Sequence, residues 1–423
     1  MLPKIASSVK PSVEGWWVCE LVSSWVENKK PINPQTHYPI NRTPLDGILP
    51  RRYSDPTMAY PLLLHAKHQG ATVTYQAFGG WIVPWRSGTF EQEYQTLRTG
   101  VGLVDYSSQA LIEVTGADRA SFLHNLLTND VKRLAPGTGC PAALLTANAK
   151  LIADVLIFAE SASLWLLCDA NRAAVIAQTL NQYLFAEQVT ITNHERAWAV
   201  LALQGPRTLE WARPLVGPAA AWAHPGDHLV ASVEGLSVRW IRHSLVGDSG
   251  LLCLCPVEHV EQMWVWLQQR GRSVGLAVVG WEALNTARIE AGLPWYGIDM
   301  DDTNLLPETG LELVAVSDTK GCYLGQEIIA RMQTYGSANK KLLGLLCDGD
   351  QAPAAGDRIF AQGAEVGVVT SGCVSPTLSR PIGMGYLKRG AHDPGTAVEI
   401  LHGRDRIAAT AAERPLVRGP GAG

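Results

Sequence analysis

The sequence predicts an α+β protein with two ferredoxin-like units followed by a small β-barrel. Strands and helices alternate in the first half in the order of a split βαβ unit, and short strands follow at regular spacing from about residue 340. The length of 423 residues suits two or three domains. Apolar residues make up 47% and charged residues 17%, which excludes a chain that is disordered throughout.

The first unit follows an amphipathic helix over 88–100, in which Phe90, Tyr94 and Leu97 recur at helical spacing and Gly100 ends the pattern. The alternation of apolar and polar residues then predicts strands and helices. The expected order is strands 101–108 and 110–116, helix 117–127, strands 151–159 and 163–169, helix 171–185, and strands at VTITNHE and WAVLALQG.

A related order recurs more weakly over 232–298, with strands in SVEGLSVRWIRHS and GLLCLCPV and a helix over 256–271. We therefore expect a core of two intertwined α+β subdomains over 58–338. The strands of the barrel domain, 339–413, are predicted in KLLGLLCD, DRIFAQG, AEVGVVTSG, PIGMGYLK and TAVEILH. Residues 414–423 are expected to form a loose tail.

Residues 1–57 differ in composition from the rest of the chain: clustered tryptophans are followed by polar sequence with several prolines. We expect a disordered extension here. An alternative is that Met58 is the true start, because patterned sequence begins at once after it.

Charge and cysteine usage limit the classes of partner. A net charge of −4 on so long a chain argues against nucleic-acid binding, and no apolar run is long enough to cross a membrane. The 8 cysteines include no C-x-x-C pair, which argues against a metal or cluster held by this chain alone. Scattered cysteines of this kind predict reduced thiols and a cytoplasmic protein.

The most informative segment is KGCYLGQE, which contains Lys320, Gly321, Cys322, Tyr323, Gly325, Gln326 and Glu327. The glycines permit tight backbone geometry around Cys322. If a helix begins near Tyr323, its positive end and Lys320 would both favour the thiolate of Cys322, so we predict a reactive thiol supported by Lys320. The alternative is a buried, inert cysteine beside a helix start.

KGCYLGQE resembles the signature of the folate-binding YgfZ-type proteins of iron–sulfur cluster assembly and repair, which are relatives of aminomethyltransferase, the T-protein of the glycine cleavage system. The resemblance covers most of residues 70–410. Other stretches match in order: GGWIVPW, EYQTLRTGVGLVDYSS, LQGP, ARIEAGLPWYGID and VGVVTSGCVSPTLSRPIGMGYL. The resemblance implies an aminomethyltransferase-like fold, with two ferredoxin-like subdomains around a central channel that holds tetrahydrofolate, and a C-terminal barrel.

The resemblance also implies carboxylates that contact folate. The family's acidic residue for the pterin lies in G-E-D-G, and Asp248 occupies that place here, although Asp-Ser-Gly also suits an ordinary turn. The family's paired aspartates in G-G-I-I-D-D match Ala153 and Asp154, so one of the pair is missing. Asp154 is expected either to meet folate or to be a polar residue on the outer face of its strand.

The family's arginine before R-L-E-A-G appears here as Leu284, whereas Arg288 remains. Arg288 is a candidate for contacting the ligand. The alternative is that it pairs with Glu290 or another acid.

Two functions follow from the resemblance. The first is a tetrahydrofolate-binding accessory protein that acts through Cys322, has transient Fe–S protein or assembly-factor partners and supports tRNA-modifying Fe–S enzymes. Such a protein would not be a conventional enzyme. The second is a tetrahydrofolate-dependent aminomethyltransferase or methyltransferase, which uses Asp154 and needs no reactive cysteine.

Overall fold

The computed structural model describes residues 60–65, 73–216, 222–335 and 338–418. The predicted extension over 1–57 and the alternative start at Met58 lie outside these residues. Residues 46–423 form one compact unit, in which the chain builds two α+β sheets, a small N-terminal sheet and a barrel.

The first α+β unit is a five-stranded antiparallel sheet with the strand order β6-β7-β8-β5-β9. Its helices α3 and α4 pack on one face around Phe122, Leu123 and Ile176. The bounds are β5 Gln109–Thr115, α3 Arg119–Leu126, β6 Gly139–Leu145, β7 Leu151–Ala159, β8 Ser163–Asp169, α4 Ala170–Gln182 and β9 Thr190–Asn193. Without β6, this is the predicted split βαβ order, and β6 is an added edge strand that the sequence pattern missed.

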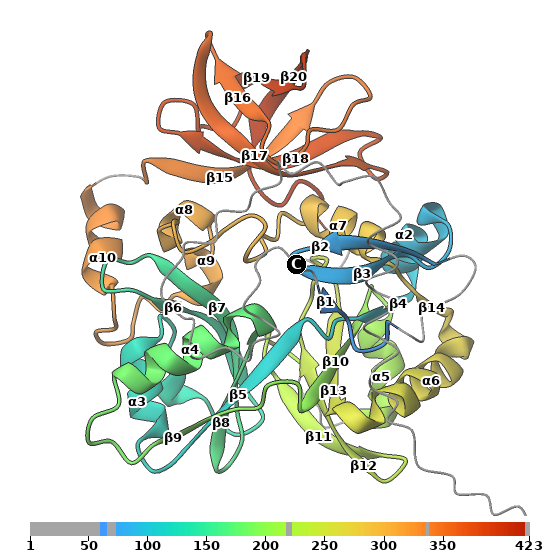
Figure 1. Ribbon diagram of the computed structural model, residues 1–423, viewed down its shortest axis with the longest axis vertical. Coiled ribbons are helices and arrows are strands. Elements are labelled where there is room, and N and C mark those ends of the chain that lie inside the picture. Colours follow the sequence, from blue (N-terminus) through green and yellow to red (C-terminus); the bar gives the residue numbers. More distant parts are fainter. Residues whose placement is uncertain (1–59, 66–72, 217–221, 336–337, 419–423) are drawn as a thin grey trace, which may run out of the picture. The chain divides into compact units, whose positions relative to one another are not determined.

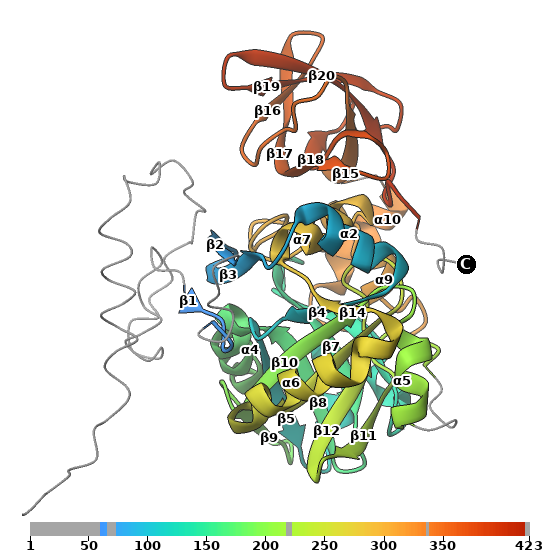
Figure 2. The ribbon, with the colours of Figure 1, turned by 90° about the vertical axis from the view of Figure 1, so that its right-hand side faces the viewer.

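The second unit is a six-stranded sheet with the order β11-β12-β13-β10-β4-β14. Helices α5 and α6 cover one of its faces (Figure 2). The bounds are β4 Val101–Asp105, β10 Trp198–Gln204, α5 Thr208–Val216, β11 His228–Val233, β12 Leu236–Arg242, β13 Gly250–Pro256, α6 Val260–Gly271 and β14 Leu276–Val278. Strand β4 precedes the first unit in sequence but lies between β10 and β14, so the two subdomains are intertwined as expected.

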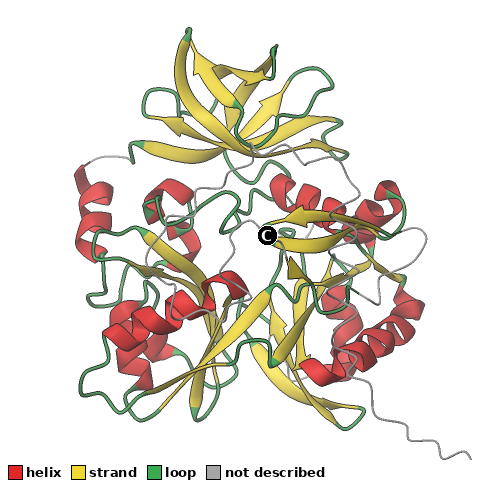
Figure 3. Cartoon of the chain, in the orientation of Figure 1, coloured by secondary structure: helices red, strands yellow, loops and turns green. Residues whose placement is uncertain are grey.

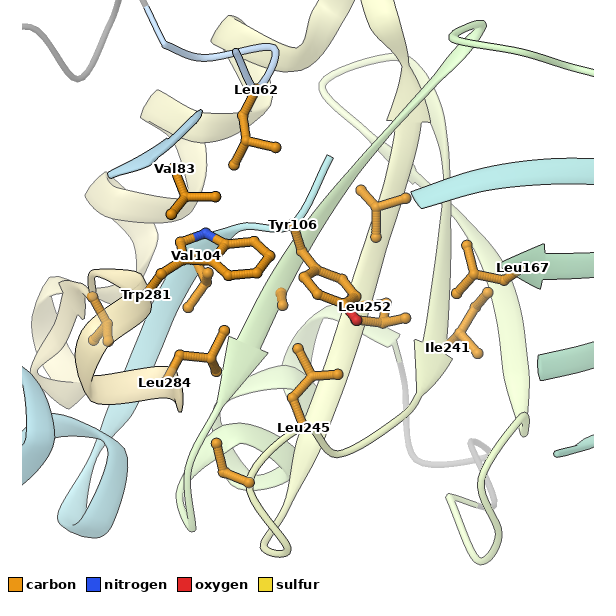
Figure 4. Close-up of a cluster of buried hydrophobic side chains, with 14 of the residues drawn as sticks. Leu62, Val83, Val104, Tyr106, Leu167, Ile241, Leu245, Leu252, Trp281 and Leu284 are labelled. Carbon is orange, nitrogen blue, oxygen red and sulfur yellow. The ribbon is translucent and has the colours of Figure 1, made fainter. Parts of the chain in front are cut away.

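The two sheets share one apolar core on the faces that their helices leave uncovered. Leu156 and Leu167 come from the first sheet, and Val200 and Leu252 come from the second. Figure 4 shows Leu167, Ile241 and Leu252 in this cluster. Because side chains alternate along a strand, successive residues of these strands pack alternately into a helix-covered core and into the shared core. This explains why the strands are apolar at nearly every position.

Further short elements pack beside the two sheets. A small sheet of β1 Tyr60–Pro61, β2 Thr74–Phe78 and β3 Trp81–Arg86 precedes α2 Phe90–Thr99. Helix α7, Trp281–Glu290, contacts both α2 and β3. The remaining helices are α8 Leu306–Thr309, α9 Glu312–Ala315 and α10 Gln326–Tyr335.

The C-terminal domain is a closed barrel of six strands with the order β15-β18-β17-β16-β19-β20, drawn entirely in strands and loops in Figure 3. The bounds are β15 Lys340–Cys347, β16 Arg358–Ala361, β17 Ala364–Ser375, β18 Arg380–Lys388, β19 Ala397–His402 and β20 Asp405–Ala412. Five of these strands were predicted, and β20 closes the barrel. The fold class predicted from the sequence is therefore confirmed.

The predicted loose tail is held down as far as residue 417. Arg414 donates hydrogen bonds to the carbonyl oxygens of Gly292 and Thr309, and the backbone N–H of Val417 donates to Glu290. These contacts fix the chain after the barrel against the loop that follows α7.

The turn between β6 and β7 is strained at Ala149, whose φ of 58° lies in the left-handed region. This turn packs closely on Gly325, where an added Cβ would lie 2.8 Å from the Thr146 carbonyl oxygen. The signature loop therefore needs a glycine at 325. Ala149 occupies a left-handed position that the resembling family fills with glycine.

We predict that Ala149→Gly stabilises the protein by about 1 kcal/mol, because it relieves the left-handed strain. Chemical denaturation of the full chain measures this effect. The matched control is Ala408→Gly on an exposed part of β20, which should destabilise by about 0.5–1 kcal/mol. Destabilisation by both substitutions would contradict the prediction.

Candidate functional site

Two aspartates lie on the same face of neighbouring strands of the five-stranded sheet. Leu156 of β7 pairs with Leu167 of β8, and two residues further along each strand lie Asp154 and Asp169. Leu156 and Leu167 both belong to the core shared by the two sheets. Because side chains alternate along a strand, Asp154 and Asp169 project from that same face. Asp154 therefore takes the inward one of its two predicted positions.

Both carboxyl groups are held in apolar surroundings that favour their neutral forms. Burial raises the pKa of Asp154 to about 6. Burial also raises the pKa of Asp169 to about 7. The charge of Asp154 adds to this effect, while hydrogen bonding to Asn171 and the charge of Arg172 oppose it. Both groups therefore titrate near neutral pH, where an acid or base in catalysis is most effective.

Asp169 also begins helix α4. Its side chain accepts a hydrogen bond of 2.8 Å from the backbone N–H of Asn171 and acts as the N-cap. One turn of this helix places Arg172 nearby, but its guanidinium donates to the carbonyl oxygen of Ile152, at 2.8 and 3.0 Å. Arg172 also lies 4.8 Å over the ring of Tyr296. The charge of Arg172 therefore acts on Asp169, while its hydrogen bonds go to a backbone carbonyl oxygen.

Tyr106 links the aspartates to a cluster of large aromatic rings. Its ring stacks on Trp281 with centroids 5.9 Å apart (Figure 4), and Trp281 meets Trp295 edge-on at 5.6 Å. Burial raises the pKa of the Tyr106 hydroxyl well above its ordinary value, and the charges of Asp169 and Asp154 raise it further. The hydroxyl therefore stays protonated.

Leu284 lies within this aromatic cluster and is fully buried. It stands where the resembling family has an arginine, so the cluster lacks that cation here. The neighbouring surface is apolar, which strengthens the effect of burial on the carboxyl groups.

Arg288 is buried and bound on every side. It pairs with Asp299 at 2.6 Å and donates to Asn285, to the carbonyl of Leu293 and to Ser371 of the barrel. Of its two predicted roles, the structure shows the pairing with an acid, and that acid is Asp299, not Glu290.

This ion pair connects the barrel to the aromatic cluster. Thr370 and Ser371 of β17 donate to one oxygen of Asp299, at 2.7 and 2.6 Å. The other oxygen accepts from the backbone N–H of Trp295, at 3.0 Å, and the Arg288 guanidinium lies 4.7 Å from the Trp295 ring centre. The barrel therefore fixes the position of Trp295 through two charged groups.

Asp248 lies in the turn between β12 and β13. Its Oδ1 accepts a hydrogen bond of 2.7 Å from the backbone N–H of Ser249, as an aspartate in a turn does. Its Oδ2 is buried without a hydrogen-bond partner in the part of the chain that the structure describes. The neighbouring Gly247 packs against Ala291, at the end of α7. An unpartnered buried carboxylate oxygen is costly, so a ligand that donates to it would be bound favourably.

The signature loop differs from its prediction in two respects. Helix α10 begins at Gln326, not near Tyr323, so Cys322 lies in the loop before the helix. The ammonium group of Lys320 donates to the carbonyl oxygens of His124, Leu127 and Asn129. Lys320 therefore caps the C-terminal end of α3, although burial lowers its pKa to about 8. The expectation that Lys320 supports the Cys322 thiol is not met by this geometry.

The other residues of the loop are anchored to different extents. Cys322 is exposed, so its buried, inert alternative is excluded. Tyr323 is buried with Leu145 and Ile329, and Gly325 packs on the β6–β7 turn. Gln326 begins α10, and the exposed Glu327 pairs with Arg331. Among the described residues, no group of three or more side chains could hold a metal ion.

Comparison with known proteins identifies the family. Residues 64–319 match the model of the GCVT N-terminal domain, and residues 340–418 match the glycine cleavage T-protein C-terminal barrel domain. The chain belongs to the glycine cleavage T-protein family.

Curated relatives are named aminomethyltransferases. That of Bacillus licheniformis is 29% identical over 84% of this chain and 97% of its own length. That of Halalkalibacterium halodurans is 31% identical over 78% of this chain and 90% of its own length. The crystal structure of aminomethyltransferase T from Bartonella henselae has a TM-score of 0.75 at 24% identity, covering 85% of this chain and 98% of that one, which supports the shared fold. These names favour the second of the two predicted functions over the Fe–S accessory function.

Asp169, Tyr106, Arg172 and Trp295 were missed as site residues. A signal for Asp169 was present, because the predicted strand pair 151–159 and 163–169, closed by a short turn, places 154 opposite 169. Its position between a strand and a helix is also typical of an N-cap.

No helix of the described residues is long and apolar enough to cross a membrane.

We predict that the stability of the folded protein falls between pH 4 and pH 7 through Asp154 and Asp169. Their folded-state pKa values lie above the unfolded ones, so the folded state binds more protons in this range and loses that advantage as the pH rises. In Asp154→Asn/Asp169→Asn this fall should be smaller by at least about 1.4 kcal/mol, the equivalent of one pKa unit. Urea denaturation at several pH values measures it, and equal pH dependence in both proteins would contradict it.

We predict that Arg288→Met destabilises the protein by about 3–5 kcal/mol, because it leaves the buried charge of Asp299 unpaired. Arg288→Met/Asp299→Asn should recover part of that loss, since no charge then remains. Ser371→Ala keeps both charges and should cost about 1 kcal/mol. Denaturation of the full chain measures all three, and a double variant less stable than Arg288→Met would argue against the ion pair as the cause.

Proposed function

We propose that this protein is a tetrahydrofolate-dependent one-carbon transferase, which moves the carbon of an aminomethyl or methylamine group to tetrahydrofolate. Membership of the T-protein family supports this proposal, and so do relatives named aminomethyltransferase that match over nearly their full length. The observation that carries it is Asp154, an inward-facing carboxyl group with a pKa near neutrality at the family's aspartate position.

The residues present fit a bound folate. The unpartnered Oδ2 of Asp248 can accept a hydrogen bond from the donor edge of a pterin, at the place of the family's acidic residue. Asp154 would lie toward the reacting end of the ligand. Tetrahydrofolate, when bound, supplies the nitrogen that accepts the one-carbon unit. Asp154 holds or takes a proton at its carboxyl oxygen, and the apolar core around it excludes water.

We predict that Asp154→Asn lowers kcat/KM about 100-fold, because the amide can neither take up nor give the proton. The assay is formation of methylenetetrahydrofolate from tetrahydrofolate and an aminomethyl donor, with calorimetry of tetrahydrofolate binding alongside. Asp350→Asn, at an exposed loop position, is the matched control and should leave the rate unchanged. Absence of both binding and turnover in the wild-type protein would refute the proposed function.

The exposed Cys322 is the observation that favours the second candidate, a folate-binding accessory protein for Fe–S clusters. A one-carbon transferase does not need this thiol. We predict that Cys322→Ala keeps the full rate of methylenetetrahydrofolate formation. The contrasting test is restoration of Fe–S enzyme activities in a deletion strain, with wild type and Cys322→Ser compared in parallel. If wild type restores these activities and Cys322→Ala does not, the result supports the accessory function over the transferase.

A further inference from the structure

The aspartate that ends β8 has no role in the function proposed above, yet its carboxyl group faces Asp154. The two strands are antiparallel neighbours whose last pair is Leu156 with Leu167, and Asp154 and Asp169 lie two residues beyond that pair on the same face. The charge of Asp154 acts on Asp169, and like charges on neighbouring strands repel. The face is otherwise apolar, so water screens this repulsion poorly.

The neighbouring charged and titratable groups do not neutralise two carboxylates. Tyr106 before β5, Cys168 on β8, Arg172 on α4 and Tyr296 interact with one or both carboxyl groups, and Arg288 interacts with Tyr106. Tyr106, Cys168 and Tyr296 are all held in their neutral forms by burial. Arg288 is paired with Asp299. Among these groups, Arg172 is the one cation that is not paired with an acid. Its single positive charge can offset one carboxylate, so the other carboxyl group keeps its proton.

We propose that Asp154 and Asp169 form a carboxyl pair that holds a single proton at neutral pH, and that Asp169 thereby supplies the second acid–base group missing at Ala153. The Oδ1 of Asp169 is occupied as the N-cap of α4, which leaves its Oδ2 as the oxygen that can share a proton with Asp154. The proton belongs to the pair and not to either residue, as in other coupled carboxyl groups. The destination of the proton rests on the proposed function, whereas the sharing of the proton does not.

The pair gives its proton to the nitrogen of the departing amine as the bond between that nitrogen and the transferred carbon breaks. It then takes up the proton of the first tetrahydrofolate nitrogen that bonds to the carbon. The second tetrahydrofolate nitrogen bonds to the carbon as the bond from the carbon to its carrier atom breaks, and the proton of that nitrogen goes to the carrier atom. The pair begins and ends each turnover with one proton, and no oxidant or reductant is needed. This chemistry favours a substrate whose leaving group is a basic amine, because such a nitrogen needs a proton in order to leave.

The test is a titration of the carboxyl groups by carbon NMR on protein labelled with ¹³C at aspartate Cγ, without folate. In wild type, two aspartate signals should titrate in coupled steps. In Asp154→Asn the pKa of Asp169 should fall by one unit or more, and in Asp169→Asn the pKa of Asp154 should fall by the same amount, since each loses a like charge. Asparagine is also a good N-cap, so Asp169→Asn keeps the start of α4. Asp350→Asn is the control and should shift neither signal.

If each aspartate keeps its wild-type pKa when the other is replaced, the shared proton is refuted, whatever the enzyme does. A second readout is the pH profile of kcat/KM. Asp169→Asn should move the limb near neutrality by about one pH unit, and a purely structural role would lower the rate without moving the limb. Coupled titration without any turnover would instead refute the proposed function and leave the carboxyl pair standing.

Discussion

The repulsion between two carboxyl groups on one apolar sheet face is the constraint on which the candidate site depends. Asp154 and Asp169 are each held by a regular strand, so neither can move away without breaking the sheet. Their surroundings include one unpaired cation, Arg172, whose hydrogen bonds go to a backbone carbonyl. Burial therefore raises the pKa values of both groups toward neutrality, and the charge of Asp154 adds to this effect at Asp169.

The rest of the molecule maintains those surroundings. Both sheets expose an apolar face to a common core, and both carboxyl groups lie half-buried on this face. Through Thr370 and Ser371, the barrel holds the Arg288–Asp299 pair, and that pair holds Trp295. The aromatic cluster around Tyr106 is thus positioned in part by barrel residues that lie 71 and 72 positions from Asp299 in the sequence. This dependence gives the C-terminal barrel a physical connection to the site that does not require it to contact a ligand.

The departures from the family pattern change the chemistry available rather than the fold. Ala153 removes one carboxyl group beside Asp154, and Leu284 removes a cation from the aromatic cluster. Asp169 returns a carboxyl group from the neighbouring strand. Asp248 is shorter than glutamate by one methylene, and it keeps one oxygen buried and unpartnered. The signature loop stays tied to α3 by Lys320 and to the β6–β7 turn by Gly325, so its residues are largely structural, with Cys322 exposed.

The sequence by itself determined the α+β class, most strands and helices, and the barrel. These follow from periodicity, which local hydrogen bonding and alternating burial impose on a short segment. Tertiary structure alone decided that Lys320 caps α3, that Asp299 is the partner of Arg288, and that β4 crosses into the second sheet. Such pairings join distant segments, and their energies depend on burial and on the direction of each side chain. The spacing of residues along the chain determines neither burial nor side-chain direction.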